Sequence, residues 1–490
     1  MTTPDDVSFG RETLKGVAAR LAMYLFGFAA TAYFARELGP AVFGGFFLLL
    51  SVVQFANRVP HGLGGACQKR LAEVDTSNEE LLGLTLGATV ACGTVAATLA
   101  FVGRDLLIAY TGIPNAPVLA VALFVSMSTF LPLQFLLAGT GRFGVTHWID
   151  LGREVLKTVL QFGLVVLGFG VTGMTAGFVV ATLCFLPVLF WLLGLRPAVP
   201  TRATAVRVWE YARYNVPTNI VGKAYTRFDV FLLGWVGLTA SVGFYEVALS
   251  VTGLATLVSG VVMDGLISKV SDLSSRDLAI GETVTAAISY TSAIAIPLLV
   301  IVVFLGDAVV EAIYGSAYAA TVPLLGGIAV YRILQTQREP LDSAVKGMGR
   351  PDTAFRISAV TVAVNFALGV PLVLTVGPIG VIAATIAAES LRWDRLHRAL
   401  RRNGATVPRF PDPLRIQFRS AAGMAAVVAG LTRLGSAPGP GEVALVSALG
   451  VATYLTLLLA QDRRARRTVV AAALAARGFL GADEPVRAVH

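Results

Sequence analysis

The sequence predicts an all-α polytopic membrane protein with about 14 transmembrane helices, and two observations lead to this fold class. Apolar segments of roughly 20 residues follow one another along the chain, which is the length that a helix needs to cross ~30 Å of hydrocarbon. Of the 490 residues, 55% are hydrophobic and 14% are charged, a composition far from that of a soluble globular domain. The predicted segments are 14–35, 42–63, 81–103, 115–138, 145–169, 172–194, 207–235, 240–265, 283–306, 318–344, 353–376, 378–398, 414–434 and 441–461.

The connections between these segments predict the orientation of the chain. Seventeen Lys and Arg residues stand in the connections that follow even-numbered segments or in the segment ends beside them, whereas three, Arg36, Arg104 and Arg433, stand in or beside those that follow odd-numbered segments. Because basic loops stay on the cytoplasmic side during insertion, we expect both termini on the cytoplasmic side of the cell membrane. The formal net charge of +9 then faces anionic lipid headgroups, so we predict no nucleic-acid partner.

An Arg- and Pro-bearing stretch after the sixth segment divides the chain into halves of equal orientation, as in a parallel repeat about the membrane normal. Residues 44–52 read GGFFLLLSV and residues 243–251 read GFYEVALSV, which aligns Gly44 with Gly243. We therefore predict two parallel-repeat six-helix lobes plus two extra C-terminal helices that pack on the outside. The predicted boundaries are 1–195 for the N-terminal lobe, 196–206 for a cytoplasmic linker, 207–400 for the C-terminal lobe, 401–461 for the extra pair and 462–490 for a basic cytoplasmic tail.

Four segments carry polar and ionisable side chains at steps of three and four, which places each set on one helix face. Ionisable groups in hydrocarbon are costly, so we expect these faces to line water or one another. The four rows are Gln54, Asn57, Arg58 and His61; Asp150, Arg153, Glu154, Lys157 and Gln161; Asn215, Asn219, Lys223 and Arg227; and Arg332, Gln335, Glu339, Asp342 and Lys346.

The basic residues of these rows are the candidates for binding an anion. Lys223, Arg227 and Arg332 lie away from the cytoplasmic headgroups and need an anion or an aqueous cavity, whereas snorkelling to the headgroups is the alternative for Arg20 and Arg58. Guanidinium and ammonium groups bind phosphate strongly when desolvated, so we predict that these five residues bind a phosphate-bearing amphiphile. In the second row the charges alternate in sign, and we expect them to neutralise one another.

Acidic residues inside the segments are candidates for binding a coupling ion. We select Asp264 and Glu339 for H⁺ or Na⁺, with pairing to a neighbouring base, Lys269 for Asp264, as the alternative. The three cysteines form no CxxC spacing and no His cluster accompanies them. We therefore predict no metal site, no catalytic residues and no cofactor beyond a coupling ion.

Several strings resemble those of polysaccharide-biosynthesis flippases, the Wzx-like branch of the multidrug/oligosaccharidyl-lipid/polysaccharide (MOP) exporter superfamily. ARELGPAVFG at 35–44 and GLGGACQKRLAEV at 62–74 resemble the family's opening signature. Its later blocks are matched in order by DVFLLGWVGLTASVGFYEVA at 229–248, IYGSAYAATVPLL at 313–325, KGMGRPDTAF at 346–355 and NFALGVPLVLTVGPIGVIAATIAAES at 365–390. One departure is VVMDGLISKVSDL near the end of the eighth segment, where the family commonly has a proline before a Ser; we expect a kink there to be made differently.

The resemblance implies a function as well as a fold. It implies two lobes around a central cavity, alternating access, and transport of a lipid-linked oligosaccharide on polyprenyl or dolichyl phosphate or diphosphate across the cytoplasmic membrane for cell-surface polysaccharide or glycoprotein assembly. The expected partners are that lipid-linked saccharide, membrane lipids and other polysaccharide-assembly proteins. Three alternatives remain open: a multidrug exporter of the same fold, a membrane enzyme such as a glycosyltransferase, polymerase or ligase, and a scaffold. Cationic side chains argue against export of cationic drugs, and the short outward connections leave no domain for an active site, so we predict a protein that is not an enzyme.

Overall fold

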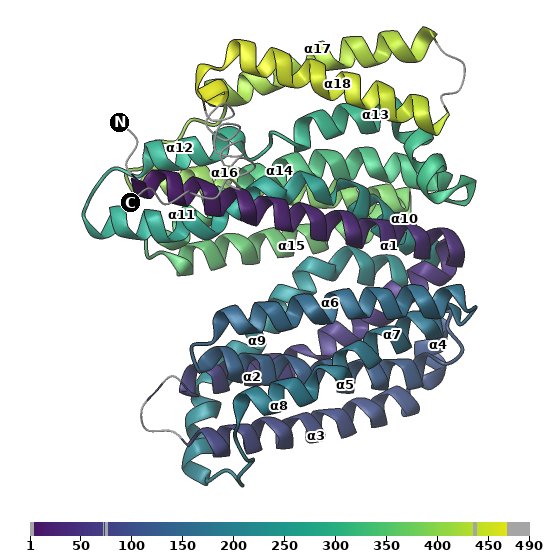
Figure 1. The fold of residues 1–490 in the computed structure, drawn as a ribbon, viewed down its shortest axis with the longest axis vertical. Helices are drawn as coiled ribbons and strands as arrows, with labels where there is room; N and C mark the ends of the chain where they lie inside the picture. Colours follow the sequence, from purple (N-terminus) through teal and green to yellow (C-terminus); the bar gives the residue numbers. More distant parts are fainter. Residues whose placement is uncertain (1–3, 72, 74–76, 435–438, 468–490) are drawn as a thin grey trace, which may run out of the picture. The chain divides into compact units, whose positions relative to one another are not determined.

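The computed structural model describes residues 4–71, 73, 77–434 and 439–467, and within them it does not describe the side chains of residues 4–20, 22, 264 and 434. The secondary structure of the described residues consists of helices (Figure 1). Contacts between Cα atoms divide the chain into a middle unit, residues 30–246, and a terminal unit, residues 1–29 together with residues from 247 onward. This division differs from the predicted lobes at 1–195 and 207–400, whose boundaries stay a prediction.

The middle unit contains the second part of the long first helix and the helices up to the start of α10. Its hydrophobic core joins α2, α3, α5, α8 and α9 through residues such as Leu82, Leu133 and Leu189, which are fully buried. The helices are α1 (Pro4–Ala56), α2 (Arg58–Leu71), α3 (Asn78–Val102), α4 (Arg104–Thr111), α5 (Ala116–Gly139), α6 (Phe143–Val166), α7 (Gly170–Cys184), α8 (Leu186–Leu193), α9 (Arg202–Trp235) and α10 (Thr239–Thr252).

Glycine and proline set the ends and breaks of the first helices. Gly39 has φ 73° and ψ 164° inside α1 and precedes Pro40, so the chain turns there, as the sequence predicts between its first two segments. A second break separates α1 from α2 at Asn57. Pro60 explains it, because its ring clashes with the carbonyl group four residues earlier and it has no N–H to donate.

Gly44 and Gly243 lie against each other where α1 crosses the start of α10. A Cβ atom at Gly44 would lie 2.1 Å from the carbonyl oxygen of Thr239, and one at Gly243 would lie 2.2 Å from that of Pro40. Small residues let helix backbones approach this closely in membrane proteins. The two glycines that the internal repeat aligns are therefore also in contact.

The terminal unit contains the start of α1 and the helices from the end of α10 onward. Within it, α14, α15 and α16 pack together, and one core cluster includes Val270, Leu341 and Leu396. The further elements are the 3-10 turn η1 (Gly253–Thr256), α11 (Leu257–Ser275), α12 (Gly281–Tyr290), α13 (Ala295–Tyr314), the 3-10 turn η2 (Ser316–Thr321), α14 (Val322–Gly347), α15 (Pro351–Val376), α16 (Pro378–Arg402), α17 (Asp412–Leu434) and α18 (Pro440–Gln461).

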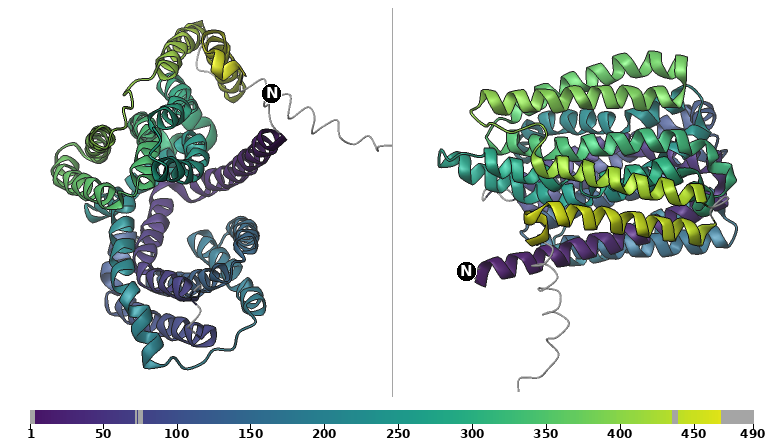
Figure 2. Two further views of the ribbon diagram at one scale, coloured as in Figure 1. Left: turned by 90° about the vertical axis from the view of Figure 1, so that its left-hand side faces the viewer. Right: turned by 90° about the horizontal axis from the view of Figure 1, so that it is seen from above.

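The predicted extra pair, α17 and α18, is confirmed as a pair of neighbouring helices. The two pack on each other, on α13 and, through α17, on α12 (Figure 2). Met424, Val428 and Tyr454 are among the buried residues of that contact. The predicted tail at 462–490 is described only to residue 467, and the remainder lies outside the described residues.

Each of the predicted apolar segments overlaps helical structure; 353–376, for example, corresponds to α15 and 441–461 to α18. Among the described residues, nine helical stretches are long and apolar enough to cross a membrane by length and composition alone. Predicted segments such as 145–169 and 207–235 are absent from those nine because α6 and α9 carry several charged residues. The count of fourteen crossings therefore stays a prediction.

Candidate functional site

Two cations of the middle unit converge on one glutamine at the break between α1 and α2. The ammonium group of Lys223, on α9, donates to Gln54 Oε1 at 2.5 Å, and Arg58 Nε donates to the carbonyl oxygen of Gln54 at 3.0 Å. Both basic side chains are half-buried. Since Arg58 is the first residue of α2, the break that Pro60 makes places its guanidinium group beside the end of α1. We refer to Gln54, Arg58 and Lys223 as the cationic cluster.

The row of polar residues along α9 lies against α2, as the fourfold spacing predicts for one helix face. Asn215 Nδ2 donates to the carbonyl oxygen of Gly62 at 2.8 Å. Asn219 Nδ2 donates to the carbonyl oxygen of Asn215 at 2.8 Å and to its side-chain oxygen at 3.1 Å. Asn215 therefore ties α9 to α2, and Asn219 orients the Asn215 amide from within α9; Lys223 lies one turn further on, in reach of Gln54.

Arg227, the last cation of that row, finds an anion within the chain. It forms an ion pair with Glu246 of α10, whose side chain is 8% exposed. Among the described residues, no carboxylate pairs with Arg58 or Lys223. The three bases and one acid therefore leave an excess of two positive charges, and these belong to the cationic cluster. A role of Arg227 in substrate binding stays a prediction.

Asn57 and His61 complete the α1–α2 row without entering this hydrogen-bond pattern. Asn57 is fully buried, and both polar atoms of its side chain lack a partner among the described residues. His61 packs edge-on against the ring of Phe135, with 4.8 Å between ring centroids. A buried amide without a hydrogen-bond partner is unusual. Because Asn57 directly precedes Arg58, polar side chains gather at the break between α1 and α2.

Arg332 belongs to the terminal unit and lies at a second helix break, where η1 interrupts the helix between α10 and α11. Arg332 Nη2 donates to the carbonyl oxygen of Leu249 at 3.2 Å, and the hydroxyl group of Tyr24 donates to that of Ser250. These carbonyl groups belong to the last turn of α10, and in the last turn of a helix no backbone N–H group of a following helical turn donates to the carbonyl groups. Side chains therefore cap the end of α10 at η1. The string at 261–273, where a kink different from the family's is expected, lies inside α11, and that kink stays a prediction.

The other two nitrogens of Arg332 also have neutral partners. Nε donates to Thr252 Oγ1 at 3.3 Å and Nη1 to Gln335 Oε1 at 2.8 Å. Gln335 in turn donates to Glu339 at 2.8 Å, and Glu339 lies 3.8 Å from the guanidinium group of Arg338. Arg332 therefore binds the break through Nε and Nη2, Nη1 binds within its own helix α14, and Glu339 has a basic neighbour. Their predicted roles, substrate binding and ion coupling, stay predictions.

Acids and bases inside the terminal unit pair with one another. Arg338 Nε lies 2.8 Å from Glu389, which is 1% exposed. Asp342 lies 3.3 Å from Arg392 and 2.6 Å from Lys346. These buried acids therefore have basic partners within the unit. Arg338 and Arg392 were not among the candidates chosen from the sequence, because Glu389, the partner of Arg338, and Asp342, the partner of Arg392, lie fifty or more residues away along the chain.

The charged row of α6 is self-neutralising, as the alternation of signs predicts. Arg153 lies 3.0 Å from Asp150 and 2.6 Å from Glu154, and Lys157 also pairs with Glu154. The guanidinium group of Arg153 additionally lies 4.9 Å from the ring centroid of Phe130. This row joins helices and leaves no cation for a ligand.

Two predicted site residues cannot be placed with their side chains. Arg20 lies in α1 and Asp264 in α11, but the side chains of both lie outside the described part of the chain. Within the described residues, no group of three or more His, Cys, Asp or Glu side chains is arranged to hold a metal ion. The substrate role of Arg20 and the ion-coupling role of Asp264 stay predictions.

Comparison with known sequences identifies one protein family and two named relatives. A family described as polysaccharide biosynthesis protein matches residues 33–323. The probable flippase AglR of Haloferax volcanii is 26% identical over 448 residues, which cover 90% of this chain and 94% of that protein. The probable low-salt glycan biosynthesis flippase Agl15 of the same organism is 27% identical over 370 residues, covering 73% and 76%.

Solved structures show the same fold. The lipid II flippase MurJ in an inward closed conformation superposes with a TM-score of 0.75 at 16% identity, covering 91% of this chain and 98% of that chain. An inward-facing multidrug resistance transporter of the MATE family, in the MOP superfamily, superposes with a TM-score of 0.61 at 15% identity, covering 77% and 96%. The predicted class, an all-α polytopic membrane protein, is thereby confirmed.

Proposed function

The chain belongs to the polysaccharide biosynthesis protein family, and from that membership we propose that it moves a lipid-linked oligosaccharide across the cytoplasmic membrane. The observation that carries the proposal is the cationic cluster, in which Arg58 and Lys223 have no carboxylate partner among the described residues and share the neutral acceptor Gln54. The names of the relatives AglR and Agl15, both probable flippases, support the same function.

The chemistry of the cluster suits the phosphate or diphosphate that joins a saccharide to a polyprenyl or dolichyl carrier. A phosphate oxygen is a stronger acceptor than the Gln54 amide, because a hydrogen bond between two charged groups is roughly twice as strong as a neutral one. Substrate binding therefore exchanges Gln54 for phosphate at Lys223, and Nη1 and Nη2 of Arg58, which have no described partner, offer two more donors. When the substrate leaves, Gln54 again accepts from Lys223.

Transport by this route needs no covalent step. We propose that two lobes rock about a central cavity by alternating access, with the saccharide in the cavity and the lipid tail in the bilayer. Both termini then lie on the cytoplasmic side, as the distribution of basic residues indicates. A coupled H⁺ or Na⁺ completes the cycle, with Glu339 and Asp264 as the candidate groups.

The test is reconstitution of purified protein in liposomes with a lipid-linked saccharide whose outer-leaflet fraction is measured with an impermeant lectin. We expect Lys223→Ala and Arg58→Ala each to lower apparent substrate affinity by roughly 10- to 100-fold, the equivalent of one charge-assisted hydrogen bond of ~1.5–3 kcal/mol. The matched control is Arg213→Ala on the same helix, because Arg213 is exposed and stacks on Tyr214.

Three results would overturn the proposal. Equal transport by wild type and the Lys223 and Arg58 variants would remove the cluster from the site. Failure of wild type to transport any lipid-linked saccharide, with export of cationic drugs in the same liposomes, would indicate a multidrug exporter. A deletion strain that lacks the complete saccharide itself, rather than its transfer across the membrane, would indicate an assembly enzyme or a scaffold.

A further inference from the structure

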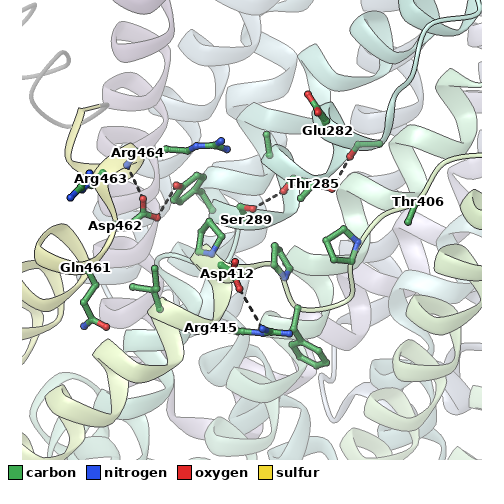
Figure 3. Close-up of a pocket in the computed structure, with 18 residues that line it drawn as sticks. Glu282, Thr285, Ser289, Thr406, Asp412, Arg415, Gln461, Asp462, Arg463 and Arg464 are labelled. Carbon is green, nitrogen blue, oxygen red and sulfur yellow. Dashed lines mark hydrogen bonds and ion pairs between the residues drawn. The ribbon is translucent and has the colours of Figure 1, made fainter.

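A pocket of about 960 Å³ lies in the terminal unit, between α12, the first turns of α17 and the end of α18 (Figure 3). None of its lining residues belongs to the cationic cluster of the middle unit. Pockets of ~300–1,000 Å³ hold small molecules and comparable groups. The pocket is therefore large enough for a lipid headgroup.

Basic and apolar residues share the lining. Arg463 and Arg464 follow the end of α18 directly, and Arg415 comes from the first turns of α17. The apolar part of the wall includes Ile416 and Phe410, and Phe410 is 53% exposed. Such a lining offers donors to an anion at one side and hydrocarbon-like surface at the other.

The one buried acid of the pocket lining is already hydrogen-bonded within the chain. Asp462 is 6% exposed, and its carboxylate accepts from the Tyr290 hydroxyl at 2.8 Å and from the backbone N–H groups of Arg464 and Ala465 at 2.8 and 3.1 Å. It thus caps the short helical stretch that carries the arginines and holds it against α12. By contrast, the guanidinium group of Arg463 has no hydrogen-bond or ion-pair partner among the described residues.

The remaining charges are exposed. Asp412 lies 3.3 Å from Arg415, with side chains 86% and 65% exposed, and such exposed pairs contribute little and exchange easily. Glu282, in the first turn of α12, is also exposed and offers carboxylate oxygens that accept hydrogen bonds. A ligand with one negative charge and hydroxyl groups matches this lining better than a multiply charged anion, which Glu282 and Asp412 repel.

The position of the pocket relative to the predicted segments indicates that such a ligand comes from the surrounding membrane. The connection at 403–411 and the end of α18 both belong to the side that carries most of the Lys and Arg residues. Four arginines stand in the five residues 463–467, immediately after the last predicted crossing. Basic clusters at that place meet the headgroups of anionic lipids.

We propose that this pocket binds the headgroup of an anionic phospholipid whose single phosphodiester carries a hydroxyl-bearing group, as in phosphatidylglycerol. Arg463 and Arg464 hold the phosphate, and Glu282 and Asp412 accept from the hydroxyl groups. Phe410 packs beside the glycerol backbone at the level where the acyl chains begin. The site is independent of the transport substrate and holds a lipid of the surrounding membrane.

The experiment measures lipid retention by full-length protein released from nanodiscs into native mass spectrometry. Phosphatidylglycerol is expected to remain bound where phosphatidylcholine does not, and the double variant Arg463→Ala, Arg464→Ala is expected to weaken that retention by about tenfold or more. The matched control is Arg466→Ala, Arg467→Ala, which removes the same charge from the same stretch at residues that do not line the pocket.

A steric variant keeps the proposal testable without a change of charge. Ala286 is an exposed residue of the lining, so Ala286→Trp is expected to fill the pocket and to displace the lipid while the arginines stay in place. Retention by Ala286→Trp, or equal losses in the two double variants, would overturn the proposal in favour of diffuse attraction between the tail and the bilayer. Full competition by millimolar inorganic phosphate would overturn it in favour of a site for a free anion.

Discussion

The break between α12 and α13 provides a quantitative test of how this fold satisfies its backbone inside the membrane. The carbonyl groups of Ile288 and Ser289 lie where α12 ends, and glutamines from two other helices bind them. Gln337 Nε2, on α14, donates to Ile288 at 2.9 Å and to Ser292 Oγ at 2.6 Å. Gln417 Nε2, on α17, donates to Ser289 at 2.5 Å. Both glutamines are at most 5% exposed.

The perturbation is Gln337→Leu, which keeps the size of the side chain and removes its donors. Hydrogen bonds between membrane helices average about 0.6 kcal/mol, with a maximum of about 1.7 kcal/mol. Loss of two of them predicts a decrease of about 1–3 kcal/mol in the free energy of unfolding. Gln417→Leu removes one such bond and is expected to cost about half as much, and the double variant adds the two effects, because the residues bind different carbonyl groups.

The assay is denaturant-induced unfolding of the protein in mixed micelles, with hydrogen exchange of residues 288–296 as a local measurement. Gln461→Leu is the matched control, because Gln461 is exposed and donates only to Leu457 in its own helix. We expect that control to stay within about 0.5 kcal/mol of wild type. If Gln337→Leu changes the free energy no more than Gln461→Leu does, and exchange at the break is unaltered, the two glutamines do not support it.

Two further predictions concern packing and charge. Arg338→Met leaves the buried Glu389 carboxylate without its nearest base, and we expect it to lower the free energy of unfolding by about 3–5 kcal/mol. The double variant Arg338→Met, Glu389→Met is expected to recover most of that loss. The same unfolding assay measures both variants. Gly44→Ala places a Cβ atom against the Thr239 carbonyl oxygen and is expected to destabilise the protein by more than about 1 kcal/mol. Gly87→Ala, on α3 with open space around the glycine, is expected to be neutral or stabilising, and equal effects of the two glycine variants would contradict the close crossing.

The helices of this fold follow from the sequence because the bilayer imposes simple rules. An apolar stretch of about 20 residues must satisfy its backbone internally, so it forms a helix, and the predicted 353–376 and 441–461 correspond to α15 and α18 within two residues. The breaks are harder to predict. Pro60 predicts the break at Asn57, and Pro297 in the same way predicts the break between α12 and α13. No proline accompanies η1, which side chains from other helices stabilise.

The candidate site was predictable in part. Helical spacing correctly placed Lys223 and Arg227 on one face of α9, because that rule depends only on the pitch of the helix. The partner of each residue was not predictable, since Gln54 lies 169 residues from Lys223 and a single sequence carries no signal for that contact. Arg227 pairs with Glu246, whereas Lys223, one turn away, meets a neutral amide, and only three-dimensional contacts separate the two.

These partners divide the intramembrane cations into two groups that a pair of measurements distinguishes. Arg332 gives two of its three nitrogens to acceptors at the α10–α11 break, so Arg332→Ala exposes a backbone carbonyl group to an apolar environment and should lower stability first. Lys223 binds one neutral side chain that can find other partners, so Lys223→Ala should lower substrate affinity at nearly unchanged stability. Measuring both the free energy of unfolding and the transport activity of each variant therefore assigns each cation to one of the two groups. A cation whose loss affects transport while the fold remains intact is one that the protein keeps for an anion from outside the chain.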